Sequence, residues 1–254
     1  MMYAEERQVA IVNRARAKGR VEVAELAEIF DVTPETVRRD LTALERAGLL
    51  TRVHGGAIMI DLTGFEPALS VRETVNTREK QAIAQAALDL VPEQGAIALD
   101  AGSSTYRLAE LIPAGRTLTV VTNSLPIASL LSGRGSLEVH LVGGRVRERT
   151  LATVDATALA YLRGIYVDVA FLGMNGFSLE RGLTTPDSAE AAVKAAFVTS
   201  ARRCVLLADH TKYGVDHFAH VADLAQIDTI VTDSALSDEA AADLAAAGPK
   251  VVRA

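Results

Sequence analysis

Hydrophobic side chains recur at helical spacing three times near the start of the chain. In residues 4–19 they fall within two helical turns, and in residues 21–32 they follow a spacing of three and four positions. A third run repeats the spacing, with Val37, Leu41 and Leu44 on one face. Because such spacing places side chains on one side of an α-helix, the pattern predicts three short amphipathic helices.

Polar residues mark the start of the third helix and the segment after its end. Thr33 has a hydroxyl that can cap the helix, and Pro34 suits its first position, where a missing N–H costs nothing. Beyond the helix, Leu50, Arg52 and His54 alternate before a pair of glycines, which is typical of a β-hairpin. Three short helices followed by such a hairpin predict a winged helix-turn-helix.

Apolar runs of strand length recur in the rest of the chain, with alanine-rich helical stretches between most of them. Strands are expected at 96–100, 118–122, 137–142, 167–172, 204–208 and 228–232. Apolar strands that alternate with helices are typical of a parallel sheet covered on both faces. The expected fold class is therefore α/β, with an N-terminal winged helix-turn-helix (1–57), a linker without sustained periodicity (58–72) and an open, doubly wound parallel domain (73–254).

Charge is distributed unevenly between these parts. The 254 residues have a formal net charge of −6, yet residues 1–57 contain nine Lys/Arg and nine Asp/Glu. The acidity therefore belongs to the larger part, and a nucleic-acid surface must come from local placement of cations in the first 57 residues. The hydrophobic share of 49% is ordinary for a globular protein and excludes a disordered chain.

Two further features concern the compartment. No apolar run approaches the roughly 20 residues needed to cross a bilayer, and the first ten residues are charged, without a signal-peptide core. Cys204, the single cysteine, lies in the apolar run CVLLA and can form no internal disulfide. A cytoplasmic protein without membrane contact is therefore expected, with a buried and unreactive thiol.

The face of the third helix opposite its apolar side chains gathers polar and basic residues. Glutamate and arginine on a helix often serve only solubility. In a winged helix-turn-helix, however, this helix enters the major groove, where arginine bonds guanine edges or phosphates. The residues expected to contact DNA are Thr33, Glu35, Thr36, Arg38, Arg39, Thr42, Arg46, Arg52 and His54.

Five polar segments lie mostly where predicted strands end. They are DAGSST (100–105), VTNS (121–124), LVGGR (141–145), FLGMNGF (171–177) and ADHTKYG (208–214). Ligands bind beyond the carboxyl ends of strands in an open parallel sheet. In DAGSST, Gly102 lets the backbone approach a ligand and the next three N–H groups open a helix, which favours phosphate. One such turn is equally typical of an ordinary helix cap, but five together indicate a binding site.

Longer motifs run through both parts of the chain. T-x-E-T-V-R-R-D-L and L-E-R-x-G-L-L-x-R-V-H-G-G-A closely resemble the N-terminal signature of DeoR-family transcriptional regulators, with Thr33-Pro34 where the family usually has serine and a variable residue. R-E-x(5)-E-K-x-x-I-A, L-D-A-G-S-S-T, F-L-G-x-N-G, E-A-x-V-K and A-D-H-T-K-Y-G resemble its sensor domain, which is similar to ribose-5-phosphate isomerases. The resemblance implies that Thr36, Arg38 and Arg39 face operator DNA and that a phosphorylated sugar is the effector.

The same resemblance implies where the effector lies. Its phosphate is expected on residues 102–105, namely Gly102, Ser103, Ser104 and Thr105. Either Arg145 or Arg147 suits a phosphate. Glu190 and Lys194 are one helical turn apart, so an ordinary surface ion pair and a role at the effector site both stay open. The other expected effector residues are Asp100, Asn123, Ser124, Gly143, Gly144, Asp209 and Lys212.

An active sugar-phosphate isomerase that carries a DNA-binding domain is the alternative function. Aldose–ketose isomerisation needs a carboxylate base and a group that stabilises the enediolate. Such isomerases have a motif similar to D-G-A-D-E at the strand where this chain has DVAFLGMNGF. Of the acidic residues in that motif, this chain keeps only Asp168 at the start, and residues 172–174 are not acidic. No catalytic residue and no enzymatic activity are therefore expected, although Glu190 or Asp209 is available as a base.

A metal site is a third hypothesis. Asp209, His210, His217 and His220 are close in sequence, but their spacing matches no metal-ligand motif and no further ligand is evident. Scattered surface histidines explain them better, and neither a metal nor a cofactor is expected.

The expected partners are double-stranded operator DNA, a phosphorylated sugar and a second or further copies of the chain. A single winged helix contacts too few bases for operator specificity, so a homodimer or homotetramer is expected. The segments LSGRGSLEVHLVGGRVRERTLATVD and LERGLTTPD are similar to actinobacterial relatives that govern fructose uptake. A fructose phosphate is therefore the leading candidate for the effector, whose binding is expected to relieve repression.

Overall fold

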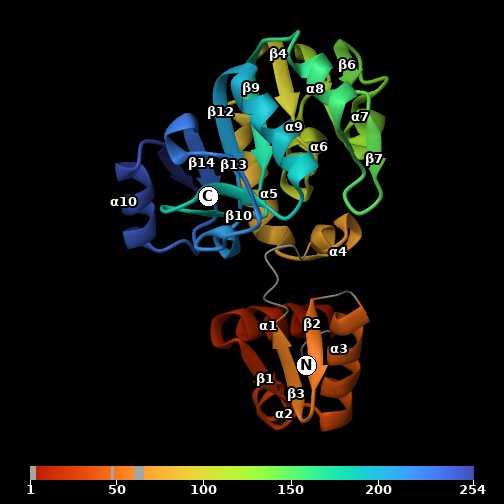
Figure 1. Ribbon diagram of the computed structural model, residues 1–254, viewed down its shortest axis with the longest axis vertical. Coiled ribbons are helices and arrows are strands. Elements are labelled where there is room, and N and C mark those ends of the chain that lie inside the picture. Colours follow the sequence, from red (N-terminus) through yellow and green to blue (C-terminus); the bar gives the residue numbers. More distant parts are fainter. Residues whose placement is uncertain (1–3, 47–48, 60–65) are drawn as a thin grey trace. The chain divides into compact units, whose positions relative to one another are not determined.

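The computed structural model describes residues 4–46, 49–59 and 66–254, which form two compact units (Figure 1). The division falls between Val75 and Asn76. Each unit has its own hydrophobic core.

The first unit is a winged helix-turn-helix followed by one further helix. Its elements are α1 (Ala4–Lys18), β1 (Arg20–Glu22), α2 (Val23–Phe30), α3 (Pro34–Arg46), β2 (Leu50–Val53), β3 (Gly56–Met59) and α4 (Leu69–Thr74). The predicted apolar helix faces meet in its core, where Ile11, Leu26 and Leu41 are almost fully buried. The three predicted helices and the hairpin are confirmed. Strand β1, which pairs with β3, has three residues and is too short for an alternating pattern to reveal.

The turn between α2 and α3 begins at Asp31, whose left-handed φ of +50° ends α2. Thr33 then caps α3, because its Oγ1 accepts a hydrogen bond from the N–H of Thr36 at 3.2 Å. Pro34 is the first residue of α3, as predicted. In the wing, Gly55 has a φ of +81°, which turns the chain between β2 and β3.

A buried ion pair joins α1 to α3. Arg7 Nε lies 2.5 Å from Asp40 Oδ2, and Gln8 Nε2 donates to Asp40 Oδ1 at 3.2 Å. The Arg7 and Asp40 side chains are 8% and 5% exposed. Apolar contacts alone permit small rotations of a helix about its axis, whereas two directional bonds to one carboxylate do not. The pair therefore holds α3 with its arginine-bearing face outward.

Part of the segment expected as a linker is structured. Residues 58 and 59 belong to β3, and residues 69–74 form α4, in which Leu69 is buried. Val71 packs against the core of the first unit. A helix of six residues is too short to show a helical period, which is why the sequence pattern missed it. Residues 60–65 of the expected linker lie outside the described residues.

The second unit is a doubly wound α/β domain built on a seven-stranded parallel sheet of order β15-β14-β12-β9-β4-β5-β6. Its helices are α5 (Thr77–Leu88), α6 (Ser103–Leu111), α7 (Leu125–Leu131), α8 (Ala156–Leu162), α9 (Ser188–Thr199) and α10 (Asp238–Ala246), with single 3₁₀ turns at His210–Lys212 and Leu224–Gln226. The sheet strands are β4 (Gln94–Leu99), β5 (Thr117–Thr122), β6 (Leu137–Leu141), β9 (Val167–Gly173), β12 (Ala201–Leu207), β14 (Thr229–Thr232) and β15 (Lys250–Arg253).

Alternate side chains of the strands enter two separate cores. On β4, Ile97 and Leu99 pack with α5, α6 and α7, whereas Ala98 faces the opposite side of the sheet with α8, α9 and α10. The two sets of helices cover the two faces of the sheet (Figure 1). Burial on both faces explains the continuous apolar runs from which the sheet was predicted. No helix among the described residues is long and apolar enough to cross a membrane.

All six predicted strands are present, and the structure adds several that the pattern missed. Edge strand β15 follows α10, and a hairpin consists of β7 (Arg145–Arg147) and β8 (Ala152–Val154). A small antiparallel sheet contains β10 (Gly176–Ser178), β11 (Gly182–Thr185) and β13 (Ala219–Ala222). These strands have three or four residues each, which is too few to establish an alternating pattern.

Cys204 is expected to resist thiol reagents in the native protein. It is 3% exposed, and burial together with nearby Asp228 raises the pKa of its thiol to about 11. At pH 8 only about a thousandth of such thiols is ionised, against roughly a quarter for an ordinary cysteine. Labelling with Ellman's reagent should therefore be slow until a denaturant unfolds the second unit. Rapid labelling without denaturant would contradict this assignment.

Candidate DNA-binding surface and sensor site

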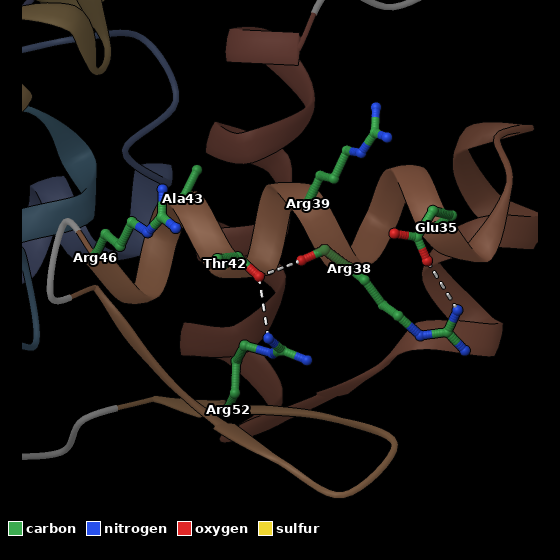
Figure 2. A pocket seen from close by; sticks show the side chains of 7 residues that line it. All are labelled: Glu35, Arg38, Arg39, Thr42, Ala43, Arg46 and Arg52. Carbon is green, nitrogen blue, oxygen red and sulfur yellow. Dashed lines mark hydrogen bonds and ion pairs between the residues drawn. The ribbon is translucent and has the colours of Figure 1, made fainter.

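Outward-facing side chains of α3 and one from β2 line a hollow of about 400 Å³. Its lining residues are Glu35, Arg38, Arg39, Thr42, Ala43, Arg46 and Arg52 (Figure 2). All of them except Ala43 were expected to contact DNA. The structure thus brings together four guanidinium groups against one lining carboxylate, on the surface of a chain whose net charge is negative.

Wing strand β2 is held against α3 by Arg52. Its Nη1 donates to Thr42 Oγ1 at 3.0 Å, and its backbone N–H donates to Glu45 Oε1 at 3.0 Å. The Thr42 hydroxyl in turn donates to the carbonyl of Arg38 at 2.8 Å. Arg52 therefore ties the wing to α3, and Glu45, which was missing from the expected set, takes part in the same connection.

The arginines of α3 differ in how far they are already engaged. Arg38 Nη1 lies 3.4 Å from Glu35 Oε2, an exposed pair of small energetic value. Among the described residues, neither the Arg39 nor the Arg46 side chain has a hydrogen bond or ion pair, and Figure 2 shows both side chains extending from the helix without a drawn interaction. These two guanidinium groups keep their donors available to an anion.

The remaining expected DNA contacts lie at the start of α3 and in the turn of the wing. Thr33 and Thr36 share a hydrogen bond between their hydroxyls, 2.9 Å apart, at the start of α3. His54 is exposed in the turn between β2 and β3. Thr33 and His54 are exposed, Thr36 is half-buried, and none of the three lines the hollow.

In the second unit, the expected sensor residues gather where parallel strands end, and a buried ion pair lies at their centre. Lys194 Nζ on α9 bonds Asp100 Oδ2 just beyond β4, and it donates to the carbonyl of Gly173 at 2.9 Å. Both charged side chains are at least 96% buried. Burial raises the pKa of Asp100, and Lys194 only partly offsets this effect. Asp100 Oδ1 is buried without a hydrogen-bond partner among the described residues.

Glu190 is bound separately from Lys194. Its Oε1 accepts hydrogen bonds from Arg147 Nη1 at 2.6 Å and from the Thr150 hydroxyl, while Arg147 Nε lies 3.3 Å from Asp187 Oδ2. Burial by itself raises the pKa of Glu190, but Lys194, Thr150 and Arg147 together hold it below its usual value. Glu190 and Lys194 are therefore two buried groups with different partners, and the surface ion pair considered from the sequence is absent.

The two candidate phosphate-binding arginines occupy different places on the β7–β8 hairpin. Arg145 forms an ion pair with Asp155 at 2.7 Å, and its side chain is 60% exposed. Arg147, by contrast, is 15% exposed and reaches the buried carboxylate of Glu190. Gly144 precedes the hairpin with a φ of +139°, and a Cβ there would lie 2.3 Å from the carbonyl oxygen of Val154. Only Arg147 joins the buried network, whereas Gly143 and Gly144 shape the entry into the hairpin.

The start of α6 presents hydrogen-bond donors close to the Asp100–Lys194 pair. Ser103 and Ser104 open the helix and are largely buried, yet neither hydroxyl has a hydrogen-bond partner among the described residues. A Cβ at Gly102 would lie 3.7 Å from Gly173 Cα, so the loops after β4 and β9 approach closely. Thr105, in contrast, donates its hydroxyl to the carbonyl of Asp100 at 2.6 Å and supports the loop.

Asn123 and Ser124 brace the neighbouring loops. Asn123 Oδ1 accepts from the N–H of Ala101 at 2.9 Å, and its Nδ2 donates to the carbonyl of Thr153 at 3.3 Å. Ser124 Oγ accepts from the N–H of Ile127 and caps α7. Both side chains lie at the expected strand end, where they hold backbone groups in place.

Asp209 ends β12 at the same edge of the sheet. Its Oδ1 accepts from Asn76 Nδ2 at 3.0 Å and from the N–H of Thr211 at 3.1 Å. Burial by itself raises the pKa of Asp209, but Lys212, Thr211, Lys80 and Asn76 together hold it below its usual value. The sequence pattern did not predict that Asn76, Lys80, Thr150 and Asp187 belong to these hydrogen-bond and charge networks. Lys80 lies in the E-K pair of the R-E-x(5)-E-K-x-x-I-A motif, which was the one sequence feature that pointed to any of them.

The groups considered for catalysis or metal binding are placed elsewhere or already paired. Asp168, near the amino end of β9, accepts a hydrogen bond from the N–H of Ala96 at 2.9 Å. It therefore lies at the amino ends of the strands, opposite to the expected effector residues. His210 Nδ1 lies 2.8 Å from Asp233 Oδ1, and His220 Nε2 lies 3.2 Å from Asp223 Oδ1. Within the described ranges, no three His, Cys, Asp or Glu side chains are grouped as metal ligands.

Comparison with known proteins identifies relatives over nearly the whole chain. The model of the DeoR-like helix-turn-helix domain matches residues 7–63, and that of the DeoR C-terminal sensor domain matches residues 75–234. The HTH-type transcriptional regulator GlpR of Haloferax volcanii is 36% identical over 97% of this chain and 96% of its own length. The HTH-type transcriptional repressor GlcR of Bacillus subtilis is 31% identical over 96% and 93% of the two chains. The uncharacterized HTH-type transcriptional regulator FruR of that bacterium is 33% identical over 92% of each.

Among solved structures, ribose 5-phosphate isomerase A from Neisseria gonorrhoeae matches with 19% identity and a TM-score of 0.39, over 54% of this chain and 53% of the isomerase. A likeness this distant carries no inference about activity.

Proposed function

This chain belongs to the DeoR family of transcriptional regulators, and from that premise we propose that it represses a sugar-utilisation operon and leaves its operator when it binds a phosphorylated sugar. The proposal has two parts, an operator-binding surface on α3 and the wing, and an effector site at the carboxyl edge of the sheet in the second unit. A fructose phosphate is the leading candidate for the effector.

The operator part rests on the hollow between α3 and β2. Arg38, Arg39, Arg46 and Arg52 surround it, and Arg39 and Arg46 keep their donors available. Phosphates and guanine edges accept hydrogen bonds from guanidinium groups, and the third helix of a winged helix-turn-helix enters the major groove. The threonines at the start of α3 are suited to phosphate contacts, and Arg52 and His54 to contacts of the wing with the adjacent backbone.

The effector part rests on the unsatisfied groups beside the buried Asp100–Lys194 pair. The hydroxyls of Ser103 and Ser104 lack partners among the described residues at the N-terminus of α6, where backbone donors and the helix dipole favour an anion. Asp100 Oδ1 is a buried acceptor without a donor among those residues. A ligand with both a phosphate and hydroxyl groups satisfies both needs, because phosphate accepts hydrogen bonds and a sugar hydroxyl donates one.

Oligomer formation is part of the same proposal. One α3 contacts only a few base pairs, so two copies are needed to read an operator with half-sites roughly 10–10.5 base pairs, or a multiple of that distance, apart. A sugar phosphate then acts by favouring an arrangement of the paired DNA-binding units that fits the operator less well.

Fluorescence anisotropy of labelled DNA from the gene's own upstream region tests the proposal. We expect tight binding that weakens steeply with salt and that one phosphoester in a panel reverses, while its free sugar and inorganic phosphate do not. The panel contains fructose 1-phosphate, fructose 6-phosphate, and galactitol, tagatose, deoxyribose and glycerol phosphates. Binding that no member disturbs would overturn the effector part, and absence of sequence-specific binding would overturn the operator part.

A further inference from the structure

Asn76 is placed where the two compact units join, and its side chain does not cap the helix that follows it. It precedes α5 with φ +53° and ψ +44°, a left-handed conformation that asparagine tolerates. An asparagine at this position commonly caps the helix through its side-chain oxygen, but Asn76 makes no such bond. Its amide Nδ2 instead donates to Asp209 Oδ1 at 3.0 Å and lies 3.4 Å from Thr211 Oγ1.

The carboxylate that Asn76 holds is one of the proposed effector residues. Asp209 is 1% exposed at the carboxyl end of β12, and the same Oδ1 also accepts from the backbone N–H and the hydroxyl of Thr211. Lys80, buried one turn further along α5, lies close enough to stabilise the same negative charge. The start of α5 is therefore linked to Asp209 by the hydrogen bond of Asn76, and the charge of Lys80 favours the ionised form of the same carboxyl group.

The chain on the other side of Asn76 leads directly into the first unit. Val75 is the last residue of that unit and follows α4, which ends at Thr74. Consecutive Cα atoms are held about 3.8 Å apart, so a displacement of Asn76 moves Val75 and the end of α4 with it. This connection is covalent and requires no particular contact between the surfaces of the two units.

We propose that Asn76 is a positioning residue that couples the sensor site to the DNA-binding unit: its hydrogen bond makes the placement of Asp209 and the path of the chain into α4 depend on one another. The inference rests on the proposed function, because Asp209 is one of the groups assigned to the effector. When a sugar phosphate engages the carboxyl edge of the sheet, Asp209 and Asn76 rearrange together. Coupling between two sites is reciprocal, so operator binding also changes the surroundings of Asp209.

This reciprocity allows a test that uses operator DNA as its only probe. Hydrogen exchange of backbone amides in residues 209–213 is measured with and without the operator duplex, for the wild-type chain and for Asn76→Ala. We expect the duplex to change exchange in the wild type and to leave it unchanged in the variant, although both bind DNA. A wild-type chain that binds DNA without any change in this segment, or a variant that keeps the change, would overturn the proposal.

Thr211→Val is the matched control. It removes a hydrogen bond to the same carboxylate, yet Thr211 lies outside the segment that joins the units. This variant is expected to alter the sensor site itself but to keep the DNA-dependent change in exchange. Loss of the change in both variants would show that it follows the integrity of Asp209 alone and would refute a specific role for Asn76. Thermal melting followed by circular dichroism verifies that both variants are folded.

A second measurement uses fructose 1-phosphate and the other sugar phosphates of the panel. Allosteric couplings are typically 5–150-fold, and we expect Asn76→Ala to reduce the effector-induced loss of operator affinity to nearly 1-fold. Effector affinity measured without DNA should fall no further in Asn76→Ala than in Thr211→Val, so a general defect of the sensor site cannot explain a loss of coupling that is confined to Asn76→Ala. A wild type that binds no operator at all would instead refute the proposed function, and the titration of DNA with the wild-type chain distinguishes that failure from a failure of Asn76.

Discussion

An Arg38→Ala/Arg39→Ala variant is expected to bind its operator more weakly by roughly 2–6 kcal/mol, since each arginine that contacts a base edge or phosphate contributes roughly 1–3 kcal/mol. Both side chains line the hollow on α3 and are exposed. The slope of log affinity against log salt should become shallower by about 1 for each arginine that contacts a phosphate. Anisotropy titrations at several salt concentrations measure both quantities.

The chain offers a matched control for this variant. Arg202 and Arg203 are also adjacent and exposed, at the start of β12 in the second unit. Their double replacement by alanine changes the net charge equally but leaves α3 intact, so operator affinity should remain within about threefold of the wild type. Equal losses in the two double variants would show that total charge, and not the α3 surface, controls binding.

The single variants separate the two arginines. The Arg38 side chain is partly engaged by Glu35, whereas the Arg39 side chain has no hydrogen bond or ion pair among the described residues. We therefore expect Arg39→Ala to have the larger effect on affinity, and Glu35→Gln to strengthen non-specific binding slightly by releasing Arg38. A larger effect of Arg38→Ala would show that the exposed pair with Glu35 is replaced by DNA contacts.

Replacing Lys194 by methionine is expected to lower the free energy of unfolding of the second unit by about 3–5 kcal/mol. Lys194 is the partner of Asp100, and both side chains are almost fully buried. Methionine fills similar space but leaves a buried carboxylate that already has one oxygen without a hydrogen bond among the described residues. Urea denaturation followed by circular dichroism measures the loss.

The pH dependence of this variant follows from the pKa of Asp100. Burial raises that pKa in the folded state, and removing Lys194 removes the main opposing effect. The folded state then binds a proton more tightly than the unfolded state, so stability is greatest below the ordinary pKa of aspartate and falls as pH rises through the folded value. The difference between wild type and variant should accordingly be larger at pH 8 than at pH 5.

Two further variants give this prediction its controls. Adding Asp100→Asn to Lys194→Met removes the unpaired charge and should recover much of the lost stability, because replacing both members of a buried pair costs less than breaking it. Lys18→Met removes a half-exposed lysine that pairs with Glu25 and should change stability by at most about 1 kcal/mol. A loss for Lys194→Met no larger than that for Lys18→Met would contradict the importance of the buried pair.

The sequence by itself determined the elements whose signal is local or periodic. The apolar faces of α1, α2 and α3, the cap at Thr33 and the hairpin turn at Gly55 depend on neighbouring residues, and all were predicted. Most of the six predicted strands were visible because burial on both faces demands continuous apolar residues. The outward face of α3 followed from helix geometry, so the residues that line its hollow could be named in advance.

Only the tertiary structure decided the partners of the buried charges. From their spacing, Glu190 and Lys194 suit an ion pair with each other, yet Lys194 bonds Asp100, which is 94 positions away, and Glu190 bonds Arg147. Asn76 and Asp209 are likewise far apart in sequence and meet because the start of α5 reaches the end of β12. Periodicity reports which face of an element is buried, whereas the position of a partner across the core depends on how distant elements pack, and no local pattern contains that information.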